Sequence, residues 1–89
     1  MAWRIEYSRD AEREIARLDR QIAQRIIRFM GSRVAKLEDP RSIGQALAGS
    51  TLGCYWKYRV GDYRIIADLQ DAKLIVQVVR VGNRREICR

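Results

Sequence analysis

Apolar residues alternate with charged ones at the start of the chain and then recur every three or four positions. The alternation covers residues 3–7 and predicts a short strand with one buried face. A helix should follow, because Ser8 or Asp10 can cap its first turn and the apolar repeat continues to about Leu18. The chain is therefore predicted to begin with a strand and a helix.

A second, longer helix is predicted to begin at Arg20. Asp19 offers its N-cap, and Pro40 with the two acidic residues before it should end the helix, because proline cannot continue one. Gly31 weakens the helix by up to about 1 kcal/mol relative to alanine, but the apolar repeat continues past it. We expect the apolar stripe of this helix to pack into the core: Ile22, Ile26, Met30, Val34 and Leu37.

The second half of the chain contains a glycine-bearing loop followed by three strand patterns. We expect an ordered loop over residues 41–53, with Leu47 turned inward. The strands are predicted over residues 54–60, 63–69 and 74–81. Gly61-Asp62 suits a type II′ hairpin turn between the first two strands, and residues 70–73 form a longer turn.

This order of elements predicts an α+β fold in a single domain over residues 1–89. An N-terminal strand and a two-helix hairpin precede a three-stranded meander, whose consecutive hairpins make its strands antiparallel. The helices should pack on one face of the sheet and leave the other face available.

Charge and residue usage narrow the function. The chain has 18 Lys and Arg against 11 Asp and Glu, a net charge of +7 and a pI near 10.1, which favours a polyanionic partner. It has no histidine, so the commonest general base and the Ser-His-Asp and Cys-His arrangements are excluded. Cys54 and Cys88 are interpreted as two unrelated reduced thiols, and we expect neither a metal nor a cofactor.

No apolar run approaches the roughly 20 residues of a membrane span, and the first residues do not form a signal-peptide pattern. We therefore expect a cytoplasmic protein that does not associate with a membrane.

Strand parity predicts where the cations of the second half lie. If Trp56 and Tyr58 face the helices, then Tyr55, Lys57 and Arg59 project from the opposite face. On the next strand the same parity turns three residues to that face: Arg64, Ile66 and Asp68. The last strand adds further cations at one edge, so four of them should converge on one positive surface: Lys57, Arg59, Arg64 and Arg84.

Three interpretations of this surface follow from the residues alone. The cations are ordinary solubilising residues on an uncovered sheet face, or they bind nucleic-acid phosphates beside a stacking Tyr55, or they bind an acidic protein.

Two segments of the second half of the chain resemble the motifs of a known protein superfamily. YWKYRVGDYRIIADL (residues 55–69) and RVGNRREI (residues 80–87) are similar to the paired motifs of the RelE/ParE superfamily of bacterial toxins, particularly its RelE-like branch. The resemblance covers nearly the whole chain, since the predicted order of elements also matches. It implies a metal-independent endoribonuclease that cuts mRNA on the ribosome and is neutralised by an acidic, partly disordered antitoxin.

The resemblance also implies residue roles. Lys57 would activate the attacking RNA 2′-OH, Arg64 would hold the scissile phosphate, and Arg84 would stabilise the charge that develops in the transition state. Arg59 and Arg85 would bind backbone phosphates or ribosomal RNA.

The chain departs from the superfamily pattern at two positions. Cys88 stands where a tyrosine is usual, and Tyr55 stands where some members have a second lysine; Tyr55 or Tyr63 would then supply the aromatic ring. Two alternatives follow from these departures: a ParE-like inhibitor of DNA gyrase, and a catalytically weakened RNA-binding homologue.

Overall fold

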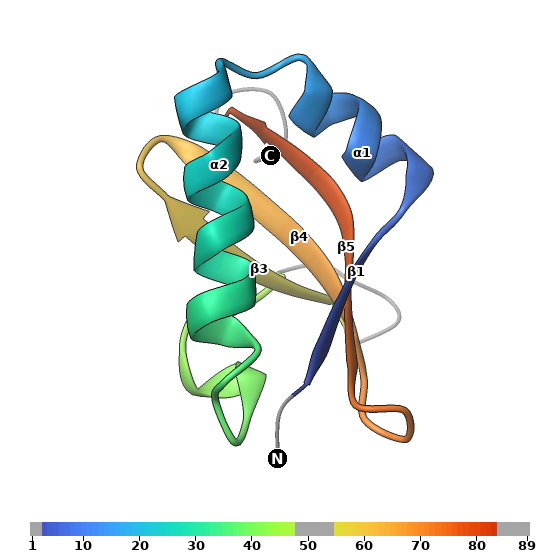
Figure 1. Ribbon diagram of the computed structural model, residues 1–89. Helices are drawn as coiled ribbons and strands as arrows, with labels where there is room; N and C mark the ends of the chain where they lie inside the picture. Colours follow the sequence, from blue (N-terminus) through green and yellow to red (C-terminus); the bar gives the residue numbers. More distant parts are fainter. Residues whose placement is uncertain (1–2, 48–54, 84–89) are drawn as a thin grey trace.

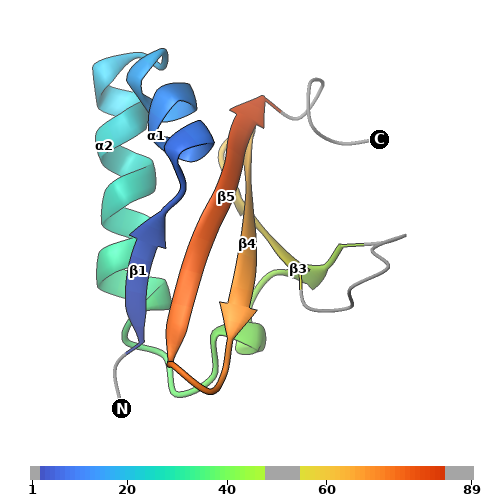
Figure 2. The same cartoon turned by 90° about the vertical axis from the view of Figure 1, so that its right-hand side faces the viewer.

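A computed structural model describes residues 3–47 and 55–83, in which two helices cover one face of a five-stranded sheet (Figures 1 and 2). The elements are β1 (Arg4–Tyr7), α1 (Arg9–Ala16), α2 (Arg20–Phe29), a π-helical turn (Met30–Val34), a 3-10 turn (Pro40–Ser42), β2 (Gln45–Ala46), β3 (Tyr55–Val60), β4 (Tyr63–Gln70) and β5 (Ile75–Asn83). The predicted α+β fold is confirmed. None of the helices in the described part has the length and apolar composition needed to cross a bilayer.

The strands lie in the order β1-β5-β4-β3-β2. The antiparallel meander of β3, β4 and β5 is confirmed. The N-terminal strand β1 pairs in parallel with β5, the last described strand, so both helices and the strands β2, β3 and β4 lie between these two neighbours in the sequence. The loop that was expected after the helices contains β2, which pairs antiparallel with the start of β3.

The helix caps follow from the sequence, but the end of the second helix does not. The side chain of Ser8 accepts a hydrogen bond from the Ala11 amide, and Asp19 caps α2 in the same way. The prediction of one regular helix to Leu37 is wrong, because α2 changes to a π-helical turn in which the Ala35 amide donates to the Met30 carbonyl. Gly31, which lies in this turn, lowers the preference for a regular helix.

The two hairpins differ in how well they match the expected turns. Gly61 has a φ of +59°, which agrees with the positive φ that a type II′ turn requires at this position. The longer turn extends through Leu74, which was expected in the strand. Leu74 instead has a φ of +55° and directs the chain into β5, which begins at Ile75 and extends to Asn83.

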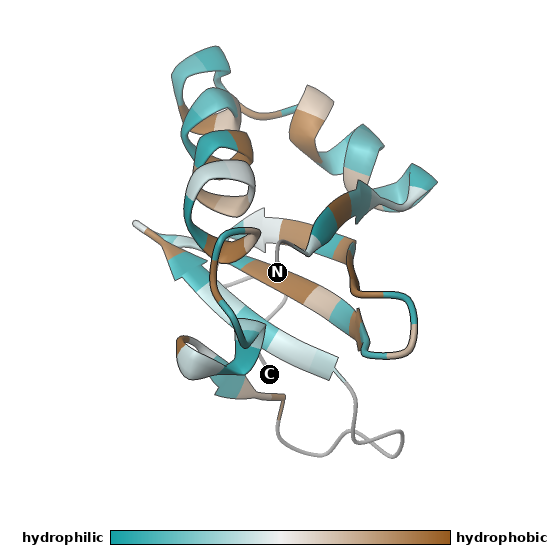
Figure 3. Ribbon diagram, turned by 60° about the horizontal axis from the view of Figure 1, so that its bottom comes forward, coloured by the Kyte–Doolittle hydropathy of each residue, from teal (hydrophilic) through white to brown (hydrophobic). Residues whose placement is uncertain are grey.

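The core lies between the helices and the sheet. Apolar residues are concentrated along the strands beneath the helices, and long stretches of both helices are polar (Figure 3). Ile26, Met30 and Val34 are fully buried, as their spacing predicts, and Ile22 is half-buried against the same cluster. The strands contribute most of the remaining core: Tyr58, Val60, Ile65, Ala67, Leu69, Val76, Val78 and Val81.

The far face of β4 is less open than strand parity predicts. Arg64 and Ile66 were expected to project outward, but each is only 7% exposed. β4 is a central strand, and Ile66 lies in register between Lys57 on β3 and Arg80 on β5. The expectation of an uncovered face is therefore wrong for the centre of the sheet.

Beyond its pairing with β1, the backbone amides and carbonyls on the outer edge of β5 form hydrogen bonds at the junction of β1, α1 and β5. The Ser8 amide donates to the Val78 carbonyl, and the Ser8 hydroxyl donates to the Val79 carbonyl. The β4–β5 register shifts at this point. Glu14 then accepts hydrogen bonds from the Val81 amide at 2.7 Å and from Arg80 Nε at 2.9 Å.

We expect Glu14→Ala to lower the free energy of unfolding by about 1–3 kcal/mol, because it removes the acceptor of the Val81 amide in a buried strand. Glu12→Ala is the control, since Glu12 is an exposed carboxylate on the same helix. Urea unfolding followed by circular dichroism measures both. Equal stability of the two variants would contradict this role of Glu14.

Candidate functional site

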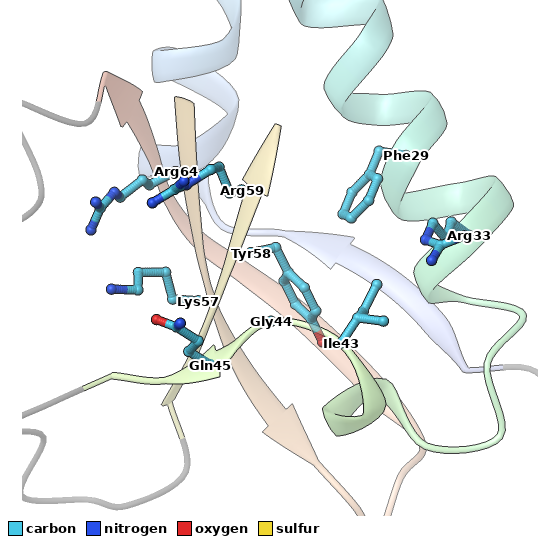
Figure 4. Close-up of a pocket in the computed structure, with 9 residues that line it drawn as sticks. All are labelled: Phe29, Arg33, Ile43, Gly44, Gln45, Lys57, Tyr58, Arg59 and Arg64. Atoms are coloured by element: carbon cyan, nitrogen blue, oxygen red, sulfur yellow. The ribbon is translucent and has the colours of Figure 1, made fainter. Parts of the chain in front are cut away.

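A cavity of about 410 Å³ opens along the edge of β3 next to α2 (Figure 4). We call it the α2–β3 groove; its lining residues are Phe29, Arg33, Ile43, Gly44, Gln45, Lys57, Tyr58, Arg59 and Arg64. Four of these are cations and none is acidic. The groove therefore has the chemistry of an anion-binding site with an apolar floor.

The alternation of β3 places its side chains on two sides of the strand. Figure 4 shows Lys57, Arg59 and Arg64 on one side and Phe29 and Arg33 beyond the other. The groove thus passes over the edge of the strand and connects the two sides.

Register brings the three strand cations together. Arg59 lies directly opposite Arg64, and Lys57 lies opposite Ile66, two residues further along β4. Diagonal neighbours of this kind have Cβ atoms within roughly 7–8 Å, so long side chains can reach one small ligand. Like charges directly opposite each other repel, and a bound anion would offset this repulsion. Gly82 faces Arg64 from β5 and adds no side chain beside it.

Two aromatic side chains of β3 hold the neighbouring loop. The Tyr58 hydroxyl donates to the Pro40 carbonyl at 2.6 Å, and Trp56 Nε1 donates to the Ile43 carbonyl at 2.7 Å. Burial raises the pKa of Tyr58, so this phenol stays protonated and donates at physiological pH. The Tyr58 hydroxyl therefore holds the loop against β3 through its hydrogen bond to the Pro40 carbonyl.

β2 covers only part of the edge of β3. Gln45 and Ala46 pair with Lys57 and Trp56, and the Leu47 amide donates to the Tyr55 carbonyl. Backbone groups of a strand face the same side at every second residue, so the amide and carbonyl of Arg59 also face this edge. Arg59 lies beyond the end of β2, and its backbone groups point to the groove.

The other predicted site residues lie elsewhere. Tyr55 shares the face of Lys57 but does not line the groove. Tyr63 packs against the core on the helix side, so it cannot supply a ring to the cationic face. The remaining predictions fall outside the described residues: Arg84, Arg85, Cys54 and Cys88. Within residues 3–47 and 55–83, no group of three metal-ligating side chains lies close enough to bind a metal ion.

Comparison with known proteins identifies the family of this chain. The family model for the ParE toxin of type II toxin–antitoxin systems matches residues 5–88. The chain belongs to the ParE toxin family. The resemblance to the RelE/ParE superfamily inferred from the two motifs is thereby confirmed. No curated protein matches the chain significantly.

Solved structures with the same fold include both free toxins and complexes. The RelBE2 toxin–antitoxin complex from Mycobacterium tuberculosis contains a chain with a TM-score of 0.83 and 21% identity, over 97% of this chain and 95% of that chain. A variant of Escherichia coli RelE in the free state has a TM-score of 0.79 and 22% identity, over 98% and 88%. A chain of the RelE–RelB complex from Pyrococcus horikoshii has a TM-score of 0.74 and 19% identity, over 97% and 99%.

The sequence prediction did not include the helix side of this toxin's groove. Phe29 and Arg33 lie within the predicted second helix, but no role was predicted for either residue from the sequence. One signal was available, because the segment between Asp19 and Glu38 contains no acidic residue but five cations: Arg20, Arg25, Arg28, Arg33 and Lys36. Periodicity alone does not say which strand these cations face.

Gly44 is required for the loop to approach β3. It has a φ of +82°, and an added Cβ would lie 2.5 Å from the Lys57 carbonyl oxygen and 2.7 Å from Trp56 Nε1. A side chain at this position would therefore be strained by its backbone conformation and would displace β2 from β3.

We expect Gly44→Ala to destabilise the toxin by about 2 kcal/mol or more, because it combines a positive φ with a backbone clash. Gly31→Ala is the matched control, since a Cβ there meets nothing within 4 Å, and it should be neutral or stabilise by up to about 1 kcal/mol. Thermal unfolding of both variants measures the difference. A Gly44→Ala protein as stable as the wild type would contradict the described approach of the loop.

Proposed function

We propose that this toxin is a metal-independent endoribonuclease that cleaves mRNA on the ribosome. The observation that carries the proposal is the cross-strand pair of Arg59 and Arg64 beside Lys57, on the rim of a groove that has no acidic side chain among its described lining residues. Three cations held on two neighbouring strands suit a substrate whose reacting group is a phosphodiester.

In the proposed reaction the RNA 2′-oxygen forms a bond to the adjacent phosphorus, and the bond from phosphorus to the 5′-oxygen breaks. Lys57 stabilises the developing 2′-oxyanion while water takes its proton, and water gives a proton to the leaving 5′-oxygen, so that a 2′,3′-cyclic phosphate and a 5′-hydroxyl result. Arg64 holds the phosphate oxygens through its planar fork, which lysine cannot reproduce. Arg84 stabilises the added negative charge, and Arg59 and Arg85 bind neighbouring phosphates.

The proposed partners follow from the same charges. The solved relatives include toxin–antitoxin complexes, and we propose that an acidic, partly disordered antitoxin neutralises this toxin. The ribosome and its mRNA would be the target, which places the toxin in the cytoplasm. Tyr55 is proposed to stack on a base, because it shares the face of Lys57.

Arg64→Lys and Lys57→Ala should each slow mRNA cleavage by about 100-fold or more, because each removes an interaction with the reacting atoms. Arg4→Ala is the control, since Arg4 is an exposed cation on the opposite edge strand of the sheet. Primer extension in a purified translation system measures cleavage, and a melting curve establishes that each variant is folded. Cleavage that is unchanged in both Arg64→Lys and Lys57→Ala would exclude this active site.

The same assay tests the C-terminal residues. Arg84→Ala should abolish cleavage if Arg84 stabilises the transition state, and Cys88→Tyr should increase it if the thiol is a weaker substitute for a phenol. Cleavage in Cys88→Tyr but not in the wild type would indicate a weakened homologue that binds RNA in a salt-dependent way.

Gyrase inhibition is the second candidate, because the family model that matches the chain is that of the ParE toxins. If the endoribonuclease proposal is right, the toxin at a concentration that cleaves mRNA completely should leave DNA supercoiling by gyrase unchanged. An agarose-gel supercoiling assay measures this, with Lys57→Ala as the paired variant. Inhibition by both proteins, without mRNA cleavage, would favour the gyrase function.

A further inference from the structure

The helix side of the α2–β3 groove carries an aromatic residue between two arginines. Arg25, Phe29 and Arg33 are spaced by four residues, so they form one stripe along α2 and the turn that follows. A methyl group placed on Gly61 would lie 3.5 Å from Arg25 Nη1, so this guanidinium lies against the β3–β4 turn. Phe29 and Arg33 line the groove itself.

Phe29 is held in place but remains accessible. Its ring meets that of Tyr58 edge to face, with 6.2 Å between the ring centroids and an interplanar angle of 64°. Phe29 is half-buried, whereas Arg25 and Arg33 are exposed. A packed aromatic ring flanked by two exposed cations is suited to stack a base and to bind the phosphates on either side of it.

We propose that this stripe is a second nucleotide subsite, which binds a nucleotide adjacent to the one that is cleaved. The RNA strand would leave the cationic face at Arg64, cross the edge of β3 at Arg59, and place its next base against Phe29 and its phosphate near Arg33. The inference rests on the proposed endoribonuclease function, because that function supplies an RNA strand on the other side of β3.

An acidic peptide is the competing occupant, and the edge of β3 argues against it. Peptide addition to a sheet uses a row of backbone groups along the edge strand. Here β2 occupies the edge as far as Lys57. Of the three residues of β3 that follow Lys57, only Arg59 has backbone groups that face this edge. The groove offers one such residue and four cations, which matches a phosphate backbone better than an added strand.

The test is fluorescence anisotropy with a short single-stranded 2′-O-methyl RNA, which cannot be cleaved by 2′-OH attack. Phe29→Leu should weaken binding about tenfold, since it removes the stacking surface while it keeps an apolar side chain. Arg25→Gln and Arg33→Gln should weaken binding and reduce the slope of log K against log salt by about 0.7 each. Arg28→Gln is the control, because it removes the same charge from an exposed position on the same helix.

The outcomes separate this subsite from the proposed function. Binding that depends on the stripe, in a toxin that does not cleave mRNA, would support a nucleotide-binding role of the stripe and exclude the nuclease. Cleavage on ribosomes, combined with equal effects of the stripe variants and Arg28→Gln, would overturn the subsite. Loss of binding to a fluorescent glutamate-rich peptide, but not to RNA, would also overturn it and assign the groove to an acidic partner. Melting curves of the two arginine variants establish that the fold is kept.

Discussion

The arrangement of the sheet and helices depends on the hydrogen bonds that the backbone groups of β5 form along its outer edge. β1 provides partners as far as Val78, and beyond that point the Ser8 hydroxyl and the Glu14 carboxylate replace a strand. An unpaired buried amide is costly, so these contacts determine where α1 begins and how it lies on the sheet. Because α1 leads directly into α2, the same junction positions the helix that forms one wall of the groove.

The opposite edge of the sheet is satisfied only in part, and this has functional consequences. Tyr58 and Trp56 donate hydrogen bonds that hold residues 40–46 against β3, and Gly44 lets the chain approach closely. β2 has only two residues and begins opposite Lys57, which leaves the Arg59 end of β3 facing the groove. A fully paired edge would close the path between the cationic face and α2. The short length of β2 is therefore part of what forms the proposed site.

The distribution of charge connects the two sides of β3. Arg59 and Arg64 are directly opposite each other, and α2 with its following turn carries cations without acidic residues between Asp19 and Glu38. Concentrating like charges in this way destabilises the folded protein, and a polyanionic ligand offsets the cost. The same property is the basis for the proposals that the groove binds RNA phosphates and that an acidic antitoxin neutralises the toxin.

The sequence by itself determined the local features of this protein. Period-two and period-four patterns, the caps at Ser8 and Asp19 and the turn at Gly61 depend on neighbouring residues, and the paired motifs identified the superfamily. Only the tertiary structure decided the parallel pairing of β1 with β5, the burial of Arg64 and the position of Phe29 and Arg33 beside β3. These features join residues that lie far apart in the chain. A local sequence pattern predicts which face of its element a side chain lies on, but it does not predict which other element packs against that face.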